Sequence, residues 1–164
     1  MKLLKCAVYL ALTGTVGFFA GRILPKGWLK PGKGWFRSFA FEKNGAVYEK
    51  LGIRKWQNKV PDMSRILPFL MPAKNLSGDY QERLPMMIQE TCVAEIVHIA
   101  VSILGLRCLW MWPGAGGVTV TVIYILLLNL PFILIQRYNR PRLIRLQQKL
   151  LSRKKQKGGF VCVS

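Results

Sequence analysis

Three apolar stretches dominate the chain and predict helices that cross a membrane. Residues 3–24 are mostly apolar or small, residues 82–112 run from a polar start into a continuous apolar stretch, and residues 118–135 are mostly apolar. The first and third stretches are close to the roughly 20 residues that a helix needs to cross a bilayer, and the second is longer. The Pro- and Gly-rich turn 113–117 separates the last two, so the pattern predicts an antiparallel helical hairpin, with a bend at Pro131.

The first span has two interpretations. A basic start before a short apolar core is typical of a signal peptide, but residues 18–22 lack a small-x-small cleavage site, which favours a retained helix. Gly14, Gly17 and Gly21 recur at helical spacings. Small residues at such spacings allow a second helix to approach closely, so we expect helix contacts along this face.

Between the first span and the hairpin, the chain breaks into short segments. Proline and glycine interrupt residues 25–34, which predicts a linker at headgroup level. Residues 38–52 predict one short helix that ends near Gly52, and residues 53–62 interleave aromatic and basic side chains, as segments that bind lipid headgroups do. Residues 63–80 contain two prolines and predict a loop or re-entrant segment.

Residues 142–155 alternate leucines with arginines and lysines and predict a basic amphipathic helix on the membrane surface. The chain as a whole is therefore expected to contain four segments. They are an N-terminal transmembrane helix (1–24), a basic-aromatic interfacial region (25–81), a transmembrane hairpin (82–135) and a basic cytoplasmic tail (136–164).

Composition supports a membrane protein. The 164 residues are 51% hydrophobic and 20% charged with a formal net charge of +18, which neither a soluble globular domain nor a disordered chain combines. We therefore predict an all-α integral membrane protein with about three transmembrane helices and interfacial amphipathic segments. Its four cysteines have no paired spacing, so no disulfide framework and no zinc site are expected. No cofactor is predicted.

The distribution of positive charge predicts the orientation. Nine lysines and arginines follow the last span, none lies in the hairpin turn, and thirteen of the 25 lie between residues 22 and 89. Positive residues collect on the cytoplasmic side, so we expect a multi-pass protein of the cell membrane with a cytoplasmic C-terminus and membrane lipids as partners. Nucleic-acid binding is a distant alternative, because the cations flank lipid-spanning segments.

A polar stripe enters the second span. Thr91, Glu95, His98 and Ser102 are spaced by three or four residues and share one helix face, with Glu90 beside it. Ionisable residues at membrane depth cost roughly 2.5–3.5 kcal/mol each and usually mark a functional interior. The stripe is therefore the candidate site.

His98 is the candidate general base. Glu95, one helical turn away, is expected to hold one ring nitrogen while the other faces a substrate. Asn129 and Gln136 lie on one face of the neighbouring span, where Asn129 is expected to orient the histidine or to stabilise an oxyanion. Two alternatives stay open: the polar groups join helices at about 0.6 kcal/mol each, or Glu90 with the Glu95-x-x-His98 element forms half of a di-iron site that a homodimer completes.

Arg137, Arg140 and Arg142 cluster with Tyr138 and Asn139 where the third span ends. Guanidinium groups bind phosphate through paired hydrogen bonds, so the cluster suits an anionic group at headgroup depth. The alternative is a stop-transfer signal with snorkelling side chains. Arg54, Lys55 and Lys59 have the same two interpretations.

Four stretches resemble the glycosyl-diaponeurosporenoate acyltransferases of staphyloxanthin carotenoid synthesis. They are Ser38 to Lys43, Arg54 to Trp56 with Lys59 to Asp62, Glu90-Thr91 with Ala94 to His98, and Asn129 to Pro131 with the string Gln-Arg-Tyr-Asn-Arg-Pro-Arg-Leu at 136–143. The match keeps its order over most of the chain. The resemblance implies a membrane enzyme that esterifies a sugar hydroxyl of a glycosylated lipid with a fatty acyl group, and hence a glycolipid acceptor and a fatty acyl donor.

The candidate site follows from these interpretations. His98, Glu95 and Asn129 are predicted to be catalytic, and the predicted substrate-binding residues are Glu90, Gln136, Arg137, Tyr138, Asn139, Arg140, Arg142, Arg54, Lys55, Trp56 and Asp62. No Gly-x-Ser-x-Gly elbow or His-x₄-Asp pattern is present, which favours direct acyl transfer, although Ser102 or a cysteine stays open as a nucleophile. The competing function is a non-enzymatic membrane adaptor that gathers anionic lipids or a partner protein.

Overall fold

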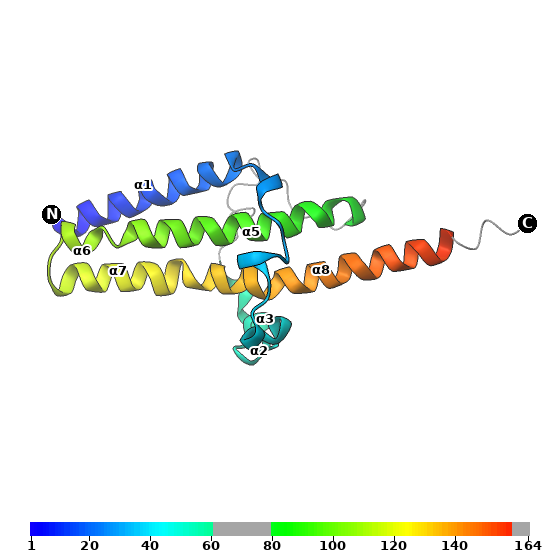
Figure 1. Ribbon diagram of the computed structural model, residues 1–164. Helices are drawn as coiled ribbons and strands as arrows, with labels where there is room; N and C mark the ends of the chain where they lie inside the picture. The colour runs from blue at the N-terminus through cyan, green and yellow to red at the C-terminus, as the bar shows by residue number, and fades with distance from the viewer. Residues whose placement is uncertain (61–79, 159–164) are drawn as a thin grey trace, which may run out of the picture. The chain divides into compact units, whose positions relative to one another are not determined.

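The computed structural model of the protein describes residues 1–60 and 80–158, and every regular element in these two ranges is a helix (Figure 1). The long helices are α1 (Lys2–Ile23), α5 (Tyr80–Gly105), α7 (Ala115–Leu128) and α8 (Leu130–Gly158). The short ones are η1 (Lys26–Trp28), η2 (Gly34–Phe36), η3 (Ala40–Gly45), α2 (Ala46–Lys50), α3 (Ile53–Trp56), η4 (Gln57–Lys59) and α6 (Cys108–Met111). The predicted all-α class is confirmed.

Within the described residues, three helical stretches are long and apolar enough to cross a membrane, as the sequence predicted. They are Lys2–Ile23, Arg83–Met111 and Ala115–Lys154. The short helix predicted within 38–52 is present as η3 followed by α2, and the chain turns at Gly52, whose φ of 66° is left-handed. The re-entrant segment predicted over residues 63–80 lies almost wholly outside the described residues; only Tyr80, the first residue of α5, is described.

The third predicted span is interrupted close to the proline that we expected to bend it. Helix α7 ends at Leu128, and Asn129 departs from helical geometry with a φ of −122°. Helix α8 then begins at Leu130, which places Pro131 in the first turn of α8, where the missing N–H of proline costs no hydrogen bond. The break at Asn129 positions this side chain in the candidate site.

The basic tail is helical, as predicted, and its helix is continuous with the third span. Helix α8 runs without a break from Leu130 through Pro141 to Gly158. Pro141 lacks the backbone N–H that would donate within the helix. Its carbonyl accepts a hydrogen bond of 3.2 Å from Arg145 Nε. The sequence interpretation stopped the span at residue 135 because hydropathy falls there, whereas helical hydrogen bonding continues through polar residues.

The chain divides into two compact units. The first consists of residues 1–29 and 90–137, and the second of residues 30–89 and 138–164. Of the three boundaries, the one after residue 29 lies between η1 and η2. Those after residues 89 and 137 fall inside α5 and α8, so these two helices contribute to both units.

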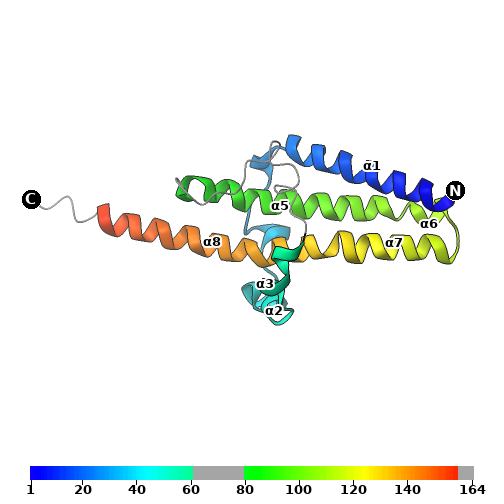
Figure 2. The same cartoon turned by 180° about the vertical axis from the view of Figure 1, so that it is seen from behind.

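In the first unit, α1 and α7 lie beside the part of α5 that follows residue 90, in both views of the structure (Figure 1 and Figure 2). Cys6, Leu10, Cys108 and Tyr124 form its buried hydrophobic cluster, which joins α1, α6 and α7. The Tyr9 hydroxyl donates to the Leu104 carbonyl at 3.1 Å and adds a polar contact between α1 and α5.

Two of the three glycines of α1 lie against α5. A Cβ atom on Gly17 would lie 2.6 Å from Val101 Cγ1, and one on Gly21 would lie 2.8 Å from Val97 Cγ2. A Cβ atom on Gly14 would meet nothing within 4 Å. The predicted close approach of a second helix is thus confirmed at Gly17 and Gly21, whereas Gly14 does not take part.

Replacing Gly17 by leucine is expected to lower the free energy of unfolding by about 1–3 kcal/mol, because the larger side chain overlaps Val101 and forces the helices apart. Gly14→Leu adds the same side chain to the same helix in open space and serves as the matched control. Thermal unfolding of both variants in detergent is the measurement. Equal destabilisation by the two substitutions would show that helix propensity or insertion, and not the contact with α5, is affected.

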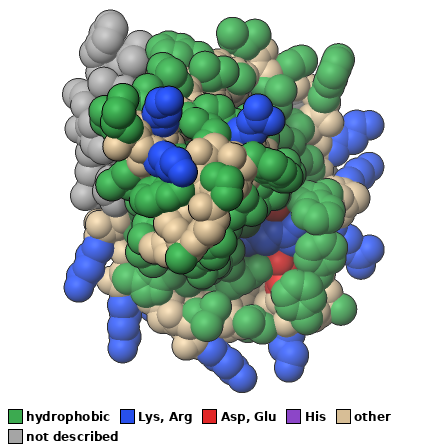
Figure 3. Space-filling model, turned by 90° about the vertical axis from the view of Figure 1, so that its left-hand side faces the viewer, with side chains coloured by type: hydrophobic (Ala, Val, Ile, Leu, Met, Phe, Trp, Pro, Cys, Tyr) green, Lys and Arg blue, Asp and Glu red, His purple; other side chains and the backbone are tan. Residues whose placement is uncertain are grey.

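Hydrophobic side chains are exposed on the candidate spans, as expected for helices that face lipid. Seen from the end where α6 and α7 meet, the surface is mainly hydrophobic (Figure 3). Examples on these helices are Leu3, Leu12, Val16, Phe19, Ile103, Leu104, Val122, Leu126 and Leu127.

In the second unit, the turn at residues 43–45 packs against α8. A Cβ atom on Gly45 would lie 3.5 Å from both Pro141 Cγ and the Tyr138 carbonyl oxygen, and the φ of Gly45 is 96°. Arg145 Nη2 donates to the Asn44 carbonyl at 2.9 Å. These contacts hold the segment before α2 to the polar half of α8.

Candidate functional site

His98 and Asn129 are in direct contact in the first unit. His98 comes from α5, and Asn129 comes from the break between α7 and α8. The His98 Nδ1 and Asn129 Oδ1 atoms are 3.0 Å apart, and Asn129 is only 3% exposed. The predicted approach of the two side chains is therefore observed, and the interruption of α7 places the amide at the imidazole.

The hydrogen bonds of Asn129 define the protonation of the imidazole. Asn129 Nδ2 donates to the Tyr124 carbonyl at 2.9 Å, and a carbonyl oxygen can only accept. The amide oxygen therefore faces His98, so Nδ1 must carry the proton and donate. In the neutral ring, Nε2 then has the lone pair, which is the form of histidine that removes a proton from a hydroxyl group.

Two further contacts fix the surroundings of the ring. The His98 ring stacks on Phe132, with centroids 4.6 Å apart and an interplanar angle of 8°. Ser102 Oγ donates to the His98 backbone carbonyl at 2.6 Å, as serine commonly does within a helix. The ring is held by Asn129 at one edge and by Phe132 over one face.

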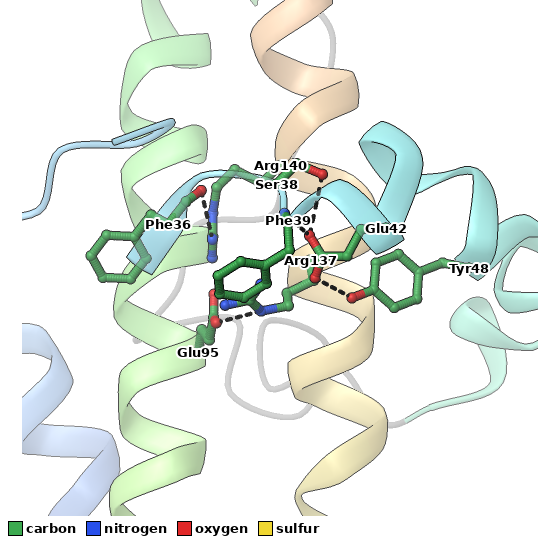
Figure 4. Close-up of polar contacts among 8 residues, drawn as sticks. All are labelled: Phe36, Ser38, Phe39, Glu42, Tyr48, Glu95, Arg137 and Arg140. Carbon is green, nitrogen blue, oxygen red and sulfur yellow. Dashed lines mark hydrogen bonds and ion pairs between the residues drawn. The ribbon is translucent and has the colours of Figure 1, made fainter. Parts of the chain in front are cut away.

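Glu95 forms an ion pair with Arg137, also in the first unit. Arg137 Nε donates to Glu95 Oε1 at 2.8 Å, and the side chains are 9% and 0% exposed (Figure 4). The sequence interpretation expected Glu95 to hold the imidazole and Arg137 to bind an anionic substrate. The structure pairs Glu95 with Arg137 instead. The imidazole contacts Asn129, the other residue that was expected to orient it.

Glu42 forms the polar centre of the second unit. It is 2% exposed and accepts hydrogen bonds from the Phe39 backbone N–H at 2.9 Å, Ser38 Oγ at 3.2 Å and the Tyr48 hydroxyl at 2.5 Å (Figure 4). The bond to Phe39 N–H is the reverse half of a capping box at the start of η3. Glu42 therefore ties η3 and α2 together.

The remaining arginines of the predicted cluster, Arg140 and Arg142, lie in the second unit and differ in burial and in contacts. Arg140 is 2% exposed, and its Nη1 donates to the Phe36 carbonyl at 3.4 Å while its guanidinium lies 5.1 Å above the Phe36 ring (Figure 4). Arg142 is more exposed, lies 4.6 Å above the buried Tyr138 ring and approaches Glu49 at 3.7 Å. Successive residues on a helix point about 100° apart, so neighbours in sequence acquire different partners.

The other predicted substrate-binding residues are placed as follows. Glu90, Gln136 and Asn139 are partly buried. Arg54 and Lys55 are exposed on α3, and Trp56 Nε1 donates to the Leu51 carbonyl at 3.2 Å. Asp62 lies outside the described residues.

Sequence reasoning missed three side chains of these clusters. Phe132 lies three residues after Asn129, on the same helix face, and this spacing could have identified it. Glu42 and Tyr48 are six residues apart in a segment that was interpreted as a short helix, with Ser38 to Lys43 as part of the family resemblance, and neither side chain was predicted to belong to a site. The signal for them was a carboxylate three residues after Phe39, the spacing of a capping box.

Over residues 1–60 and 80–158, no group of three His, Cys, Asp or Glu side chains is arranged to hold a metal ion. The described cysteines, Cys6, Cys92 and Cys108, are buried and unpaired by disulfides.

Comparison with known proteins gives a consistent result. The sequence model of one family, described as glycosyl-4,4'-diaponeurosporenoate acyltransferase, matches residues 32–149. The curated protein of that name from Staphylococcus aureus strain Newman is 34% identical over 120 residues, which cover 73% of this chain and 71% of the relative. The protein of that name from strain USA300 is 34% identical over 119 residues, which cover 72% and 71%. No solved structure matches the chain.

Proposed function

The chain belongs to the glycosyl-4,4'-diaponeurosporenoate acyltransferase family, and on this basis we propose that it transfers a fatty acyl group to a sugar hydroxyl of a glycosylated, carotenoid-like lipid. The family makes the protein an acyltransferase. The glycolipid acceptor and the fatty acyl donor are its proposed partners, and the reaction as proposed uses no cofactor.

The observation that carries the proposed mechanism is the imidazole held in one tautomer. His98 Nε2 takes the proton of the sugar hydroxyl, and the hydroxyl oxygen forms a bond to the acyl carbonyl carbon. The carbon then carries an oxyanion. As the carbonyl reforms, the bond to the carrier atom breaks, and the departing carrier takes the proton from the imidazolium. The ester product, the free carrier and neutral His98 balance the step without an acyl-enzyme.

Asn129 is proposed as a positioning residue. Its amide oxygen receives the Nδ1 proton and its amide nitrogen is engaged by the Tyr124 carbonyl, so both ends of the side chain serve the orientation of His98. Glu95 is proposed to act through Arg137, by stabilising the first part of α8 beside α5. Ser102 is not assigned a role as a nucleophile, because its hydroxyl proton is given to the helix backbone.

Lipid analysis tests the reaction. Lipids extracted from cells with and without the gene, compared by mass spectrometry, are expected to differ by one acyl group on a glycosylated lipid. The lighter glycolipid should accumulate when the gene is absent, and the acylated one should return when the gene is restored. An unchanged glycolipid profile, with the protein present in the membrane, would refute the proposed acceptor class.

For the location, we propose the cell membrane, with the C-terminus in the cytoplasm. Cys6, Cys92 and Cys108 are fully buried, so a membrane-impermeant maleimide should report on Cys162 near the C-terminus. Labelling is expected only after cells are opened, and Cys162→Ser should abolish it. Labelling in intact cells would show that the C-terminus lies outside the cell and would refute the proposed topology.

A further inference from the structure

The second unit contains a cavity of about 760 Å³ that the proposed reaction does not use. One wall is the segment from Gly32 to Asn44, and the other is the polar half of α8 between Arg140 and Gln148. Ligand sites commonly enclose about 300–1,000 Å³, so the cavity is large enough for a small ligand or a lipid headgroup.

The cavity is lined by positive charge. Arg37, Lys43, Arg140 and Arg145 contribute to its wall, and none of the lining residues is acidic. Among residues 1–60 and 80–158, neither Arg37 nor Lys43 has a carboxylate within ion-pair distance, so both cations are available to a ligand. Ser38 and Asn44 add neutral polar groups. A wall of this composition selects an anion.

Arg140 and Arg145 are held in place by the backbone opposite. Arg140 donates to the Phe36 carbonyl, and Arg145 donates to the Asn44 carbonyl through Nη2 and to the Pro141 carbonyl through Nε. A guanidinium has five N–H donors in a fixed plane. The two hydrogen bonds of Arg145 to the Pro141 and Asn44 carbonyls use two of these donors. The others remain for an anion, and the two bonds fix the direction in which they point.

The backbone at the cavity wall is strained. Lys43 and Asn44 have φ values of 46° and 54° in the left-handed region, which asparagine tolerates but lysine rarely adopts. Such strain costs on the order of 1 kcal/mol or more per residue and concentrates at ligand-binding sites. The Asn44 carbonyl, bound by Arg145, and the buried Glu42 hold the turn in this conformation. Lys43 therefore occupies a backbone conformation that glycine would adopt at a lower cost in free energy.

From the charge, the fixed donors and the strained turn, we propose that this cavity binds the phosphate group of an amphiphilic phosphoester. Phosphate accepts paired hydrogen bonds from arginine and attracts lysine as a point charge. Phe36, Phe39 and Ile144 in the wall provide an apolar surface for the adjoining organic part. A phospholipid headgroup and a soluble phosphoester share this chemistry. The proposal stands independently of the role of His98.

Binding to the full-length protein in phosphatidylcholine nanodiscs tests the proposal in two arms. One arm titrates coenzyme A and inorganic pyrophosphate as soluble probes, and the other adds phosphatidylglycerol and detects retained lipid by native mass spectrometry. Saturable binding is expected in at least one arm, and Arg37→Gln with Lys43→Gln should weaken it at least tenfold. The arm that responds identifies the source of the phosphate.

Arg54→Gln with Lys55→Gln is the matched control. It removes two cations from the same unit at exposed positions of α3 that do not line the cavity, and it should change affinity less than twofold. If both double variants weakened binding equally, general charge attraction would explain the loss of affinity, and the proposal would be overturned. An absence of saturable binding in both arms would also overturn it.

Lys43→Gly separates binding from folding. Glycine fits the left-handed backbone, so the variant is expected to unfold about 1–4 °C higher than the parent while binding the phosphate probe several-fold more weakly. Lys43→Arg keeps the charge and should retain binding. If Lys43→Gly binds as well as the parent, the lysine does not contact the anion and the proposal fails.

Discussion

Replacing His98 by alanine is expected to lower kcat for acyl transfer by about 10²–10⁴-fold, the contribution of a positioned general base. The effect follows because His98 is the single histidine of the chain and Asn129 leaves its Nε2 as the basic atom. The measurement is acylated product formed by membranes that contain equal amounts of inserted protein. Full activity of His98→Ala would refute the proposed base.

Asn129→Ala should reduce kcat by a smaller factor, about 10–100-fold, since the imidazole remains but loses its fixed tautomer. A change in the pH dependence of kcat should accompany the loss, which a merely structural defect would not produce. Ser102→Ala is the control for covalent catalysis, because it removes a hydroxyl next to the ring. It should change the rate less than threefold, and complete inactivation would indicate a serine nucleophile instead.

Replacing Glu95 or Arg137 alone by alanine is expected to lower the free energy of unfolding by about 3–5 kcal/mol. Both side chains are almost fully buried and pair at 2.8 Å, so either substitution leaves one charge in a poorly solvated place without its partner. Thermal unfolding in detergent is the measurement. Glu95→Leu combined with Arg137→Leu should recover most of the loss, because the double variant leaves neither charge unpaired.

Glu95→Gln, together with the double leucine variant, distinguishes two roles for Glu95: orienting His98 or pairing with Arg137. If Glu95 oriented His98, as its spacing in the sequence suggested, Glu95→Gln would reduce product formation with little change in stability. If Glu95 instead serves the ion pair with Arg137, its substitution should lower the free energy of unfolding. The variant with leucine at both positions should then retain measurable acyl transfer. An inactive but fully stable Glu95→Gln variant would restore the original assignment.

The sequence predicted the class of fold because hydropathy and helix length are local properties. Each of the three stretches contains an apolar run long enough to cross a bilayer, and Pro131 marked the break between α7 and α8 within two residues. The extent of α8 was harder to predict. Hydropathy falls at residue 136 although the backbone stays helical to Gly158, since helical hydrogen bonds do not require apolar side chains.

In the candidate site, the pairing of His98 with Asn129 was predicted, whereas the pairing of Glu95 with Arg137 was not. Helical spacing identified Glu95 and His98 as neighbours on one face, and proximity along a single helix suggested that they interact. In the structure, each finds its partner on another element, Arg137 on α8 for Glu95 and Asn129 for His98. Phe132 entered the site for the same reason, through the packing of its helix beside α5.

The sequence by itself therefore determined that this is an all-helical chain with membrane-spanning stretches, a polar stripe around His98 and the motifs of an acyltransferase family. Only the tertiary structure decided that Glu95 pairs with Arg137, where the strained Lys43 turn lies and which cations line one cavity. The reason is physical. Periodicity shows which face of a helix a residue occupies, whereas partners across helices depend on rotation and depth, which packing of the whole chain sets.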